Sequence, residues 1–274
     1  MKQLRVGVIG GGNMARALIE GLLRQGLPAG QIRVGEPLAE QCAALESTLG
    51  VEAGANNDYA IAGADVVLLA VKPQQLPAVA QALRPTLDSV QPVFISIAAG
   101  IRLAQLAAWR PHAPLVRAMP NRPALVGAGV TGLYALPEVS ATQRALAEQT
   151  LSAVGRTVWV RSEAELDVVT ALSGSGPAYF FLLAEQLAAA GVALGLAPET
   201  AQLLARETLH GAGALTQSGL TLAAERAAVT SKGGTTEAAL EVFARADLAG
   251  LVQRAVAAAT RRGAELAELA TRNR

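Results

Sequence analysis

The chain of 274 residues has little cysteine, histidine or aromatic side chain. Its single cysteine, Cys42, excludes an internal disulfide and fits a reducing compartment. Because Cys42 lies in an Ala/Leu-rich helical stretch, we expect it to be a buried structural thiol. The two histidines, His112 and His210, stand in unrelated contexts, and no HExxH or Cys/His cluster indicates a metal site. Aromatic residues make up 3% of the chain, so alanine, leucine and valine must build the core.

Strong net charge and a membrane-type segment are also lacking. The net charge is +1 and no Lys/Arg cluster stands out, which argues against a nucleic-acid partner. The apolar run at the amino terminus is short and glycine-rich, unlike a secretory signal. The longest uncharged window, residues 168–184, contains Ser173-Gly174-Ser175-Gly176-Pro177, which indicates a loop and a helix start rather than a membrane span. We therefore expect a cytoplasmic protein without a membrane partner.

Strand and helix patterns alternate through the first half and give way to helices alone in the second. The expected strands are 4–9, 31–34, 65–71, 93–97, 114–119, 129–135 and 157–160. This pattern predicts an α/β fold: an amino-terminal, Rossmann-like, doubly wound and mostly parallel sheet, followed by an all-α carboxy-terminal domain. We place the dinucleotide-binding domain at 1–162 and the helical dimerisation and substrate domain at 163–274. The broad Ala/Leu faces of these helices favour a homodimer interface.

Two prolines and one aspartate mark helix starts in the second half. Pro177 and Pro198 suit first helical turns, because proline lacks the N–H that would be unpaired there. Asp247 suits the N-cap of the last long helix.

A glycine-rich turn follows the first strand directly and precedes an amphipathic helix. Gly10 permits a tight turn, Gly12 permits backbone N–H groups to approach a pyrophosphate, and Ala15 keeps the helix close to the strand. The helix N-terminus then offers unpaired N–H groups to the anion. The pattern predicts a dinucleotide site whose first contacts are Gly10, Gly11, Gly12, Asn13 and Met14.

Two further strand ends carry small residues and fixed turns, as a flat cofactor requires. They add seven expected contacts: Ala70, Val71, Lys72, Pro73, Ala98, Ala99 and Gly100. Each alone is equally compatible with an ordinary loop, but together they outline one crevice. Glu36 ends the second strand, where a carboxylate binds the ribose 2′-hydroxyl of NAD and disfavours NADP, although nearby Arg33 complicates that choice. Asn56 lies in a loop that reaches toward the adenosine side.

Two glycine-rich turns remain in the helical half. Ser173–Tyr179 opens one helix and Thr230–Glu237 opens another, and such N-termini suit a small carboxylate. A nucleophile elbow or Ser/His/Asp triad has no support, because no strand precedes the serines. The chemistry therefore belongs to the cofactor.

These motifs together resemble pyrroline-5-carboxylate reductase over essentially the whole chain. The segments that carry the resemblance are Gly10–Ala15, Ala70–Pro73, Ser96–Gly100, Arg117–Asn121, Val169–Tyr179 and Gly233–Thr236. The resemblance implies reduction of 1-pyrroline-5-carboxylate to L-proline by hydride transfer from NADPH or NADH to the C=N carbon. It also implies a Rossmann domain, a helical dimerisation domain, and homodimers that in the family commonly assemble into decamers.

The resemblance also assigns the substrate contacts. Thr236 would hydrogen-bond the ring nitrogen, backbone N–H groups of Gly234, Thr235 and Thr236 would hold the carboxylate, and Ser175 and Gly176 would border the ring. Two cations depart from the family pattern: Arg122 stands where a threonine is usual and Lys232 where a proline is usual. They either strengthen anion binding or lie on the rim.

Two other functions are compatible with parts of this pattern. A β-hydroxyacid dehydrogenase would place a lysine and an asparagine on the helix after the glycine-rich turn, but Ala178–Gln186 contains neither. A cofactor-binding regulator would bind nucleotide without oxidising it in the presence of the imine. The choice between NADH and NADPH, and between dimer and decamer, stays open at this point.

Overall fold

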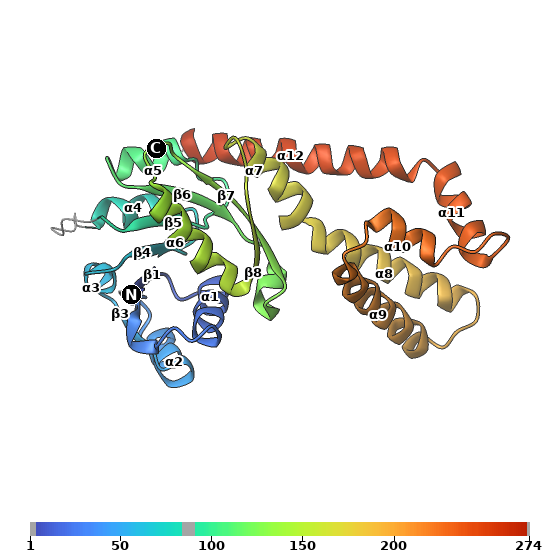
Figure 1. The fold of residues 1–274 in the computed structure, drawn as a ribbon, viewed down its shortest axis with the longest axis horizontal. Helices are drawn as coiled ribbons and strands as arrows, with labels where there is room; N and C mark the ends of the chain where they lie inside the picture. The colour runs from blue at the N-terminus through green and yellow to red at the C-terminus, as the bar shows by residue number, and fades with distance from the viewer. Residues whose placement is uncertain (1–3, 84–90, 273–274) are drawn as a thin grey trace. The chain divides into compact units, whose positions relative to one another are not determined.

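The computed structural model describes residues 4–83 and 91–272, which form two compact units (Figure 1). One unit comprises the chain up to Gly174 together with the stretch from Ala259 onward, and the other comprises Ser175–Ala258. The division of function between residues 1–162 and 163–274 stays a prediction.

The first unit contains an eight-stranded sheet in the order β3-β2-β1-β4-β5-β6-β7-β8. Neighbouring strands are parallel throughout, except that β6 and β7 are antiparallel. The strands are β1 Val6–Ile9, β2 Ile32–Gly35, β3 Glu52–Gly54, β4 Val66–Leu69, β5 Val93–Ser96, β6 Leu115–Met119, β7 Gly129–Ala135 and β8 Gly155–Trp159. This sheet confirms the predicted Rossmann-like, doubly wound fold.

Helices cover both faces of this sheet. They are α1 Asn13–Arg24, α2 Ala39–Leu49, α3 Asn57–Ile61, α4 Leu76–Ala82, α5 Leu103–Trp109, α6 Ala141–Leu151 and α7 Glu165–Val169. The 3₁₀ turns are η1 Ala29–Gln31, η2 Arg122–Val126 and η3 Ser152–Val154, and the π-helical turn η4 is Thr170–Gly174.

Side-chain alternation along the central strands builds two cores, one on each face. On β4, Val66 and Leu68 join the core that includes Leu18 of α1. Val67 and Leu69 join the opposite core, which includes Leu106 of α5. A strand that is buried on both faces requires apolar residues at every position, which explains the uninterrupted Val-Val-Leu-Leu run.

The second unit is helical, as predicted. It contains α8 Gly176–Ala193, α9 Pro198–Leu215, η5 Thr216–Ser218, α10 Leu222–Ala228, α11 Thr235–Arg245 and the first part of α12 Leu248–Arg272. Pro177 and Pro198 lie in the first turns of their helices, as expected. Asp247 accepts the N–H of Gly250 at 3.1 Å, which confirms it as the cap of α12.

Two expectations differ from the structure, and a third is not tested by it. The segment before α8 forms the π-helical turn η4 rather than a loop. The stretch Glu165–Ala193 is long and apolar enough to cross a membrane by length and composition, so the absence of a membrane partner stays a prediction. Cys42 is only half-buried, because it lies on α2 at the surface of the unit, where its Sγ donates to the carbonyl of Glu36 at 3.1 Å.

Candidate active site

The three segments predicted to hold a cofactor lie along one edge of the sheet. β1, β4 and β5 are adjacent parallel strands, so their carboxyl ends meet at this edge. The N–H of Ala70 donates to Ile9 O at 2.8 Å, and that of Ile97 donates to Leu69 O at 3.2 Å. The structure therefore brings together Gly10–Met14, Ala70–Pro73 and Ala98–Gly100.

The glycine-rich turn has the backbone that its sequence predicts. Gly10 has φ +98°, and a Cβ there would lie 2.9 Å from the carbonyl oxygen of Ala70, so only glycine fits. Gly12 caps α1, and a Cβ on Gly12 would meet nothing within 4 Å. Asn13 is exposed and Met14 half-buried at the start of this 12-residue helix. The open backbone and the unpaired N–H groups of the first turn suit a pyrophosphate.

Glu36 is tied to this turn. Glu36 is 7% exposed, and its carboxylate accepts two backbone N–H groups, that of Gly11 at 2.8 Å and that of Leu38 at 3.0 Å. The charge stabilises the turn. Glu36 directly follows β2, the position at which the sequence predicts a contact with a ribose. Partial burial, followed by the negative charges of Glu36 and Glu46, raises the pKa of the Cys42 thiol.

Asn56 lies on the same edge, beyond Glu36. It follows β3, the strand next to β2, and the N–H of Glu36 donates to Gly54 O at 2.9 Å. Its Oδ1 accepts the N–H of Tyr59 at 3.1 Å and caps α3. This exposed position is compatible with the predicted approach to an adenosine.

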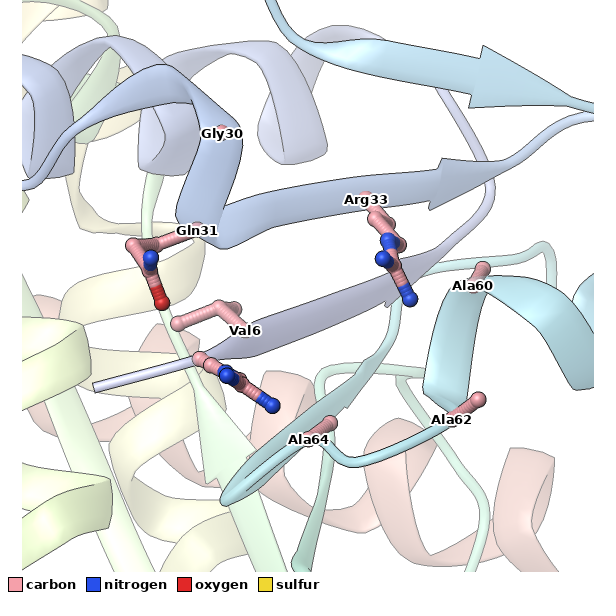
Figure 2. A pocket seen from close by; sticks show the side chains of 8 residues that line it. Val6, Gly30, Gln31, Arg33, Ala60, Ala62 and Ala64 are labelled. Carbon is pink, nitrogen blue, oxygen red and sulfur yellow. The ribbon is translucent and has the colours of Figure 1, made fainter. Parts of the chain in front are cut away.

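Arg33 does not compete with Glu36. Its Nε lies 3.1 Å from Glu52 Oε2, and its guanidinium stacks 4.5 Å from the centre of the Tyr59 ring. The Tyr59 hydroxyl donates to Glu52 Oε1 at 2.9 Å, and this hydrogen bond is the main reason why the pKa of Tyr59 is raised. Arg33 thus lines a separate pocket with Arg5, Val6 and Gln31 (Figure 2). Val6 begins β1 and Gln31 directly precedes β2, so this pocket lies at the amino ends of these strands, opposite the cofactor edge.

The second glycine-rich turn is organised around the start of α11. Gly234 caps this helix, and Thr235 and Thr236 are its first two residues. The N–H of Gly234 donates to Ser231 O at 3.0 Å, and the N–H of Gly233 donates to Glu237 Oε2 at 2.7 Å. The N–H of Gly234, expected as a carboxylate donor, thus already has an acceptor in Ser231 O, and the N–H groups of Thr235 and Thr236 form the donor end of the helix. Lys232, like Arg122 in the other unit, is exposed.

The other predicted substrate contacts stand at the start of α8. Ser175 occupies the N-cap position and Gly176 is the buried first residue. Within the helical unit, α11 lies away from this start of α8 in Figure 1. One copy of the chain therefore does not bring the two glycine-rich turns together.

Sequence reasoning missed a buried cluster of charges beside β6. Arg117 is 3% exposed and lies 3.0 Å from Glu163 Oε1 and 3.6 Å from Asp167 Oδ1. Arg102 lies 2.5 Å from Asp167 Oδ2, and Glu163 also accepts the N–H of Leu103 at 2.8 Å. The cluster thus ties the segment after β5 to α7. An arginine inside an apolar strand was the available signal, because a buried charge requires partners.

Two family models match this chain, one in each half. Residues 163–266 match the family described as "Pyrroline-5-carboxylate reductase dimerisation", and residues 5–100 match "NADP oxidoreductase coenzyme F420-dependent". A pyrroline-5-carboxylate reductase from Pseudomonas aeruginosa is 50% identical over 271 residues, which are 98% of each chain.

Solved structures agree with this similarity. A pyrroline-5-carboxylate reductase from Coxiella burnetii is 39% identical with a TM-score of 0.93, covering 97% of this chain and 99% of that one. The enzyme from Plasmodium falciparum, solved with NADP bound, is 26% identical with a TM-score of 0.80 over 97% and 99% of the two chains.

Proposed function

The chain belongs to the pyrroline-5-carboxylate reductase family, and from this premise we propose which residues carry its reaction. The protein is an NAD(P)H-dependent reductase that converts 1-pyrroline-5-carboxylate to L-proline. When bound, the nicotinamide cofactor supplies the hydride for the C=N carbon. The remaining task of the protein is to bind, orient and exclude water.

The proposed cofactor site is the sheet edge formed by Gly10–Met14, Ala70–Pro73 and Ala98–Gly100. The observation that carries this assignment is the meeting of all three segments at one edge, beside the open backbone of Gly12. Glu36 and Asn56 complete the site on the ribose and adenosine side. Because Glu36 already accepts two N–H groups, it is held in a fixed position for a ribose hydroxyl.

The proposed substrate site uses the start of α11. The N–H groups of Thr235 and Thr236, with the positive end of the helix dipole, bind the carboxylate, while Gly234 forms the turn that exposes them. The Thr236 hydroxyl hydrogen-bonds the ring nitrogen and orients its proton. Protonation makes the imine carbon a better hydride acceptor, and the ring nitrogen is basic enough that no strong protein acid is needed. Ser175 and Gly176 border the ring.

Assembly completes this site in our proposal. The helical unit belongs to the dimerisation family, and its large apolar side chains are exposed, among them Phe180, Phe181 and Leu187. α11 and the start of α8 are apart in one copy. In our proposal, the partner's helices therefore bring the turn at the start of α11 to the cofactor edge of the other protomer. We expect a cytoplasmic homodimer as the minimal active form, with the decamer as a further assembly of dimers.

Absorbance of the reduced nicotinamide tests the proposed reaction. The purified protein is mixed with 1-pyrroline-5-carboxylate and either NADH or NADPH in parallel. Loss of absorbance with either cofactor, with proline as product, supports the proposal and ranks the two cofactors. Nucleotide binding without oxidation would instead favour a regulatory role.

A further inference from the structure

One face of β6 contacts the segment that leads into α8. Arg117 and Met119 are alternate residues of the strand and so share a face, and Asn121 follows two residues later. Arg117 pairs with Asp167 of α7, Met119 packs on Gly174, and Asn121 bonds Ser173. We call these three residues the β6 platform. The proposed cofactor and substrate sites do not include this Arg117–Asn121 motif.

Asn121 makes two hydrogen bonds that fix the orientation of its carboxamide. Its Oδ1 accepts the N–H of Val130 at 2.9 Å, and its Nδ2 donates to Ser173 O at 3.1 Å. The first partner can only donate and the second can only accept, so the amide has one arrangement. At 8% exposure, Asn121 is shielded from competing water.

The carbonyl of Ser173 needs this donor because of the sequence that follows. In an α-helix this carbonyl would accept the N–H of residue 177, four positions on, but residue 177 is proline and has no N–H. The next N–H, that of Ala178, donates to Ser175 O at 3.0 Å. Asn121, more than 50 residues away in sequence, therefore supplies the missing donor.

The turn itself is shaped by its own hydroxyl groups. Thr170 Oγ1 donates to Leu166 O at 2.7 Å, and Ser173 Oγ donates to Val169 O at 2.9 Å. Such bonds to the carbonyl four residues back compete with the helix ladder and bend helices. Gly174 gives room for Met119, since a Cβ on Gly174 would lie 3.0 Å from Met119 Cε. Local chemistry thus opens the turn, and the β6 platform holds it in place within the first unit.

We propose that Asn121 is a positioning residue for imine reduction, because its bond to Ser173 O holds the end of the turn η4 in place and thereby restrains the residues that follow it directly in sequence, Ser175 and Gly176. This inference rests on the proposed function, in which those two residues border the ring of the substrate. Asn121 itself need not touch substrate or cofactor.

The substitution Asn121→Asp isolates the bond to Ser173. The aspartate is the same size and still accepts the N–H of Val130, but it presents an oxygen in place of the donor to Ser173 O. At saturating cofactor we expect kcat/KM for the imine to fall about 10- to 100-fold, because a displacement of about 1 Å at a reacting site costs up to about 100-fold. The Kd of the reduced cofactor should stay within about twofold.

Ser140→Ala is the matched control for a purely structural loss. It removes the hydrogen bond that caps α6, from Gln143 N to Ser140 Oγ at 3.3 Å, in the same unit. We expect Ser140→Ala to lower Tm about as much as Asn121→Asp does, but to leave kcat/KM for the imine unchanged. Met119→Ala is a second test that involves no buried polar group, and it should raise KM for the imine several-fold without changing the cofactor Kd.

Amide hydrogen exchange gives a readout independent of turnover. In Asn121→Asp, exchange should accelerate at residues 171–176 and stay unchanged in α1. If kcat/KM for the imine stays within about twofold of the wild-type value in both Asn121→Asp and Met119→Ala, the positioning role is overturned. A fall that only matches the loss of cofactor binding overturns it too. If the wild-type protein does not turn over the imine, the proposed function fails as well. If the wild-type protein reduces the imine and Asn121→Asp and Met119→Ala do so equally well, only the positioning role is overturned.

Discussion

Replacing Glu36 with glutamine removes one charge beside the glycine-rich turn and preserves the size of the side chain. The carboxylate uses one oxygen for Gly11 N–H and the other for Leu38 N–H. Glutamine has a single acceptor oxygen, so its NH₂ group faces one of these two donors. Loss of a hydrogen bond to a charged, buried acceptor costs about 1.5–3 kcal/mol, and we expect the free energy of unfolding to fall by that amount.

The lost charge also changes the choice of cofactor. The two negative charges of a 2′-phosphate about 6 Å from a carboxylate are repelled by about 1.4 kcal/mol even at the dielectric constant of water, and by more in a partly buried site. Because about 1.4 kcal/mol corresponds to a factor of ten, the ratio of kcat/KM for NADPH to that for NADH should rise at least about tenfold in Glu36→Gln.

The assay compares initial rates of NADPH and NADH oxidation with 1-pyrroline-5-carboxylate at several cofactor concentrations. Glu40→Gln is the matched control, because Glu40 is an exposed acidic residue four positions after Glu36, in the first turn of α2. It should leave the cofactor ratio unchanged. A ratio that moves less than about twofold in Glu36→Gln, or moves equally in both variants, would refute the assignment of Glu36 to the ribose.

Two further substitutions test the substrate turn and the buried charges. Thr236→Ala should lower kcat about 10- to 100-fold with little effect on cofactor Kd, because in the proposed site its hydroxyl contacts only substrate. Thr235→Ala is the control, and an unchanged rate in Thr236→Ala would remove Thr236 from the mechanism. Arg117→Met leaves Glu163 and Asp167 without their buried partner and should lower the free energy of unfolding by about 3–5 kcal/mol in urea titrations. A loss below about 1 kcal/mol would show that Arg102 alone compensates the two carboxylates.

The central strands were predictable because their signal is local. β1, β4 and β5 are runs of buried apolar residues, and the predicted ends agree with the structure within about two residues. β3 was missed because Glu52–Gly54 is three residues long, partly exposed and paired on one side only, so neither alternation nor hydrophobicity marks it. The short helix α3 was missed for the same reason: its five residues are too few to establish a helical period.

In the candidate site, too, features set by adjacent residues could be predicted from the sequence, whereas contacts between distant residues could not. The glycine-rich turn is encoded by adjacent residues, and the structure has the backbone that the glycines predict. The pairs Glu36–Gly11, Arg117–Glu163 and Asn121–Ser173 join residues 25, 46 and 52 positions apart, which no local pattern specifies. Only indirect signals were present: an arginine within an apolar strand, and a proline that leaves the carbonyl four residues earlier without a donor.

The helical unit shows why assembly and activity belong together in this protein. Among residues 175–258, all of which the structure describes, only Gly176 and Ala201 are buried. A unit with so little core cannot offset the conformational entropy that its ordering costs, so its helices must bury their apolar faces against a second copy. The same helices carry Ser175 on α8 and Thr236 on α11, at separate places in one copy. Under the proposed function, the contact that stabilises the unit is also the contact that brings the substrate residues together, so dilution below the dimer Kd should remove helical structure and turnover in parallel.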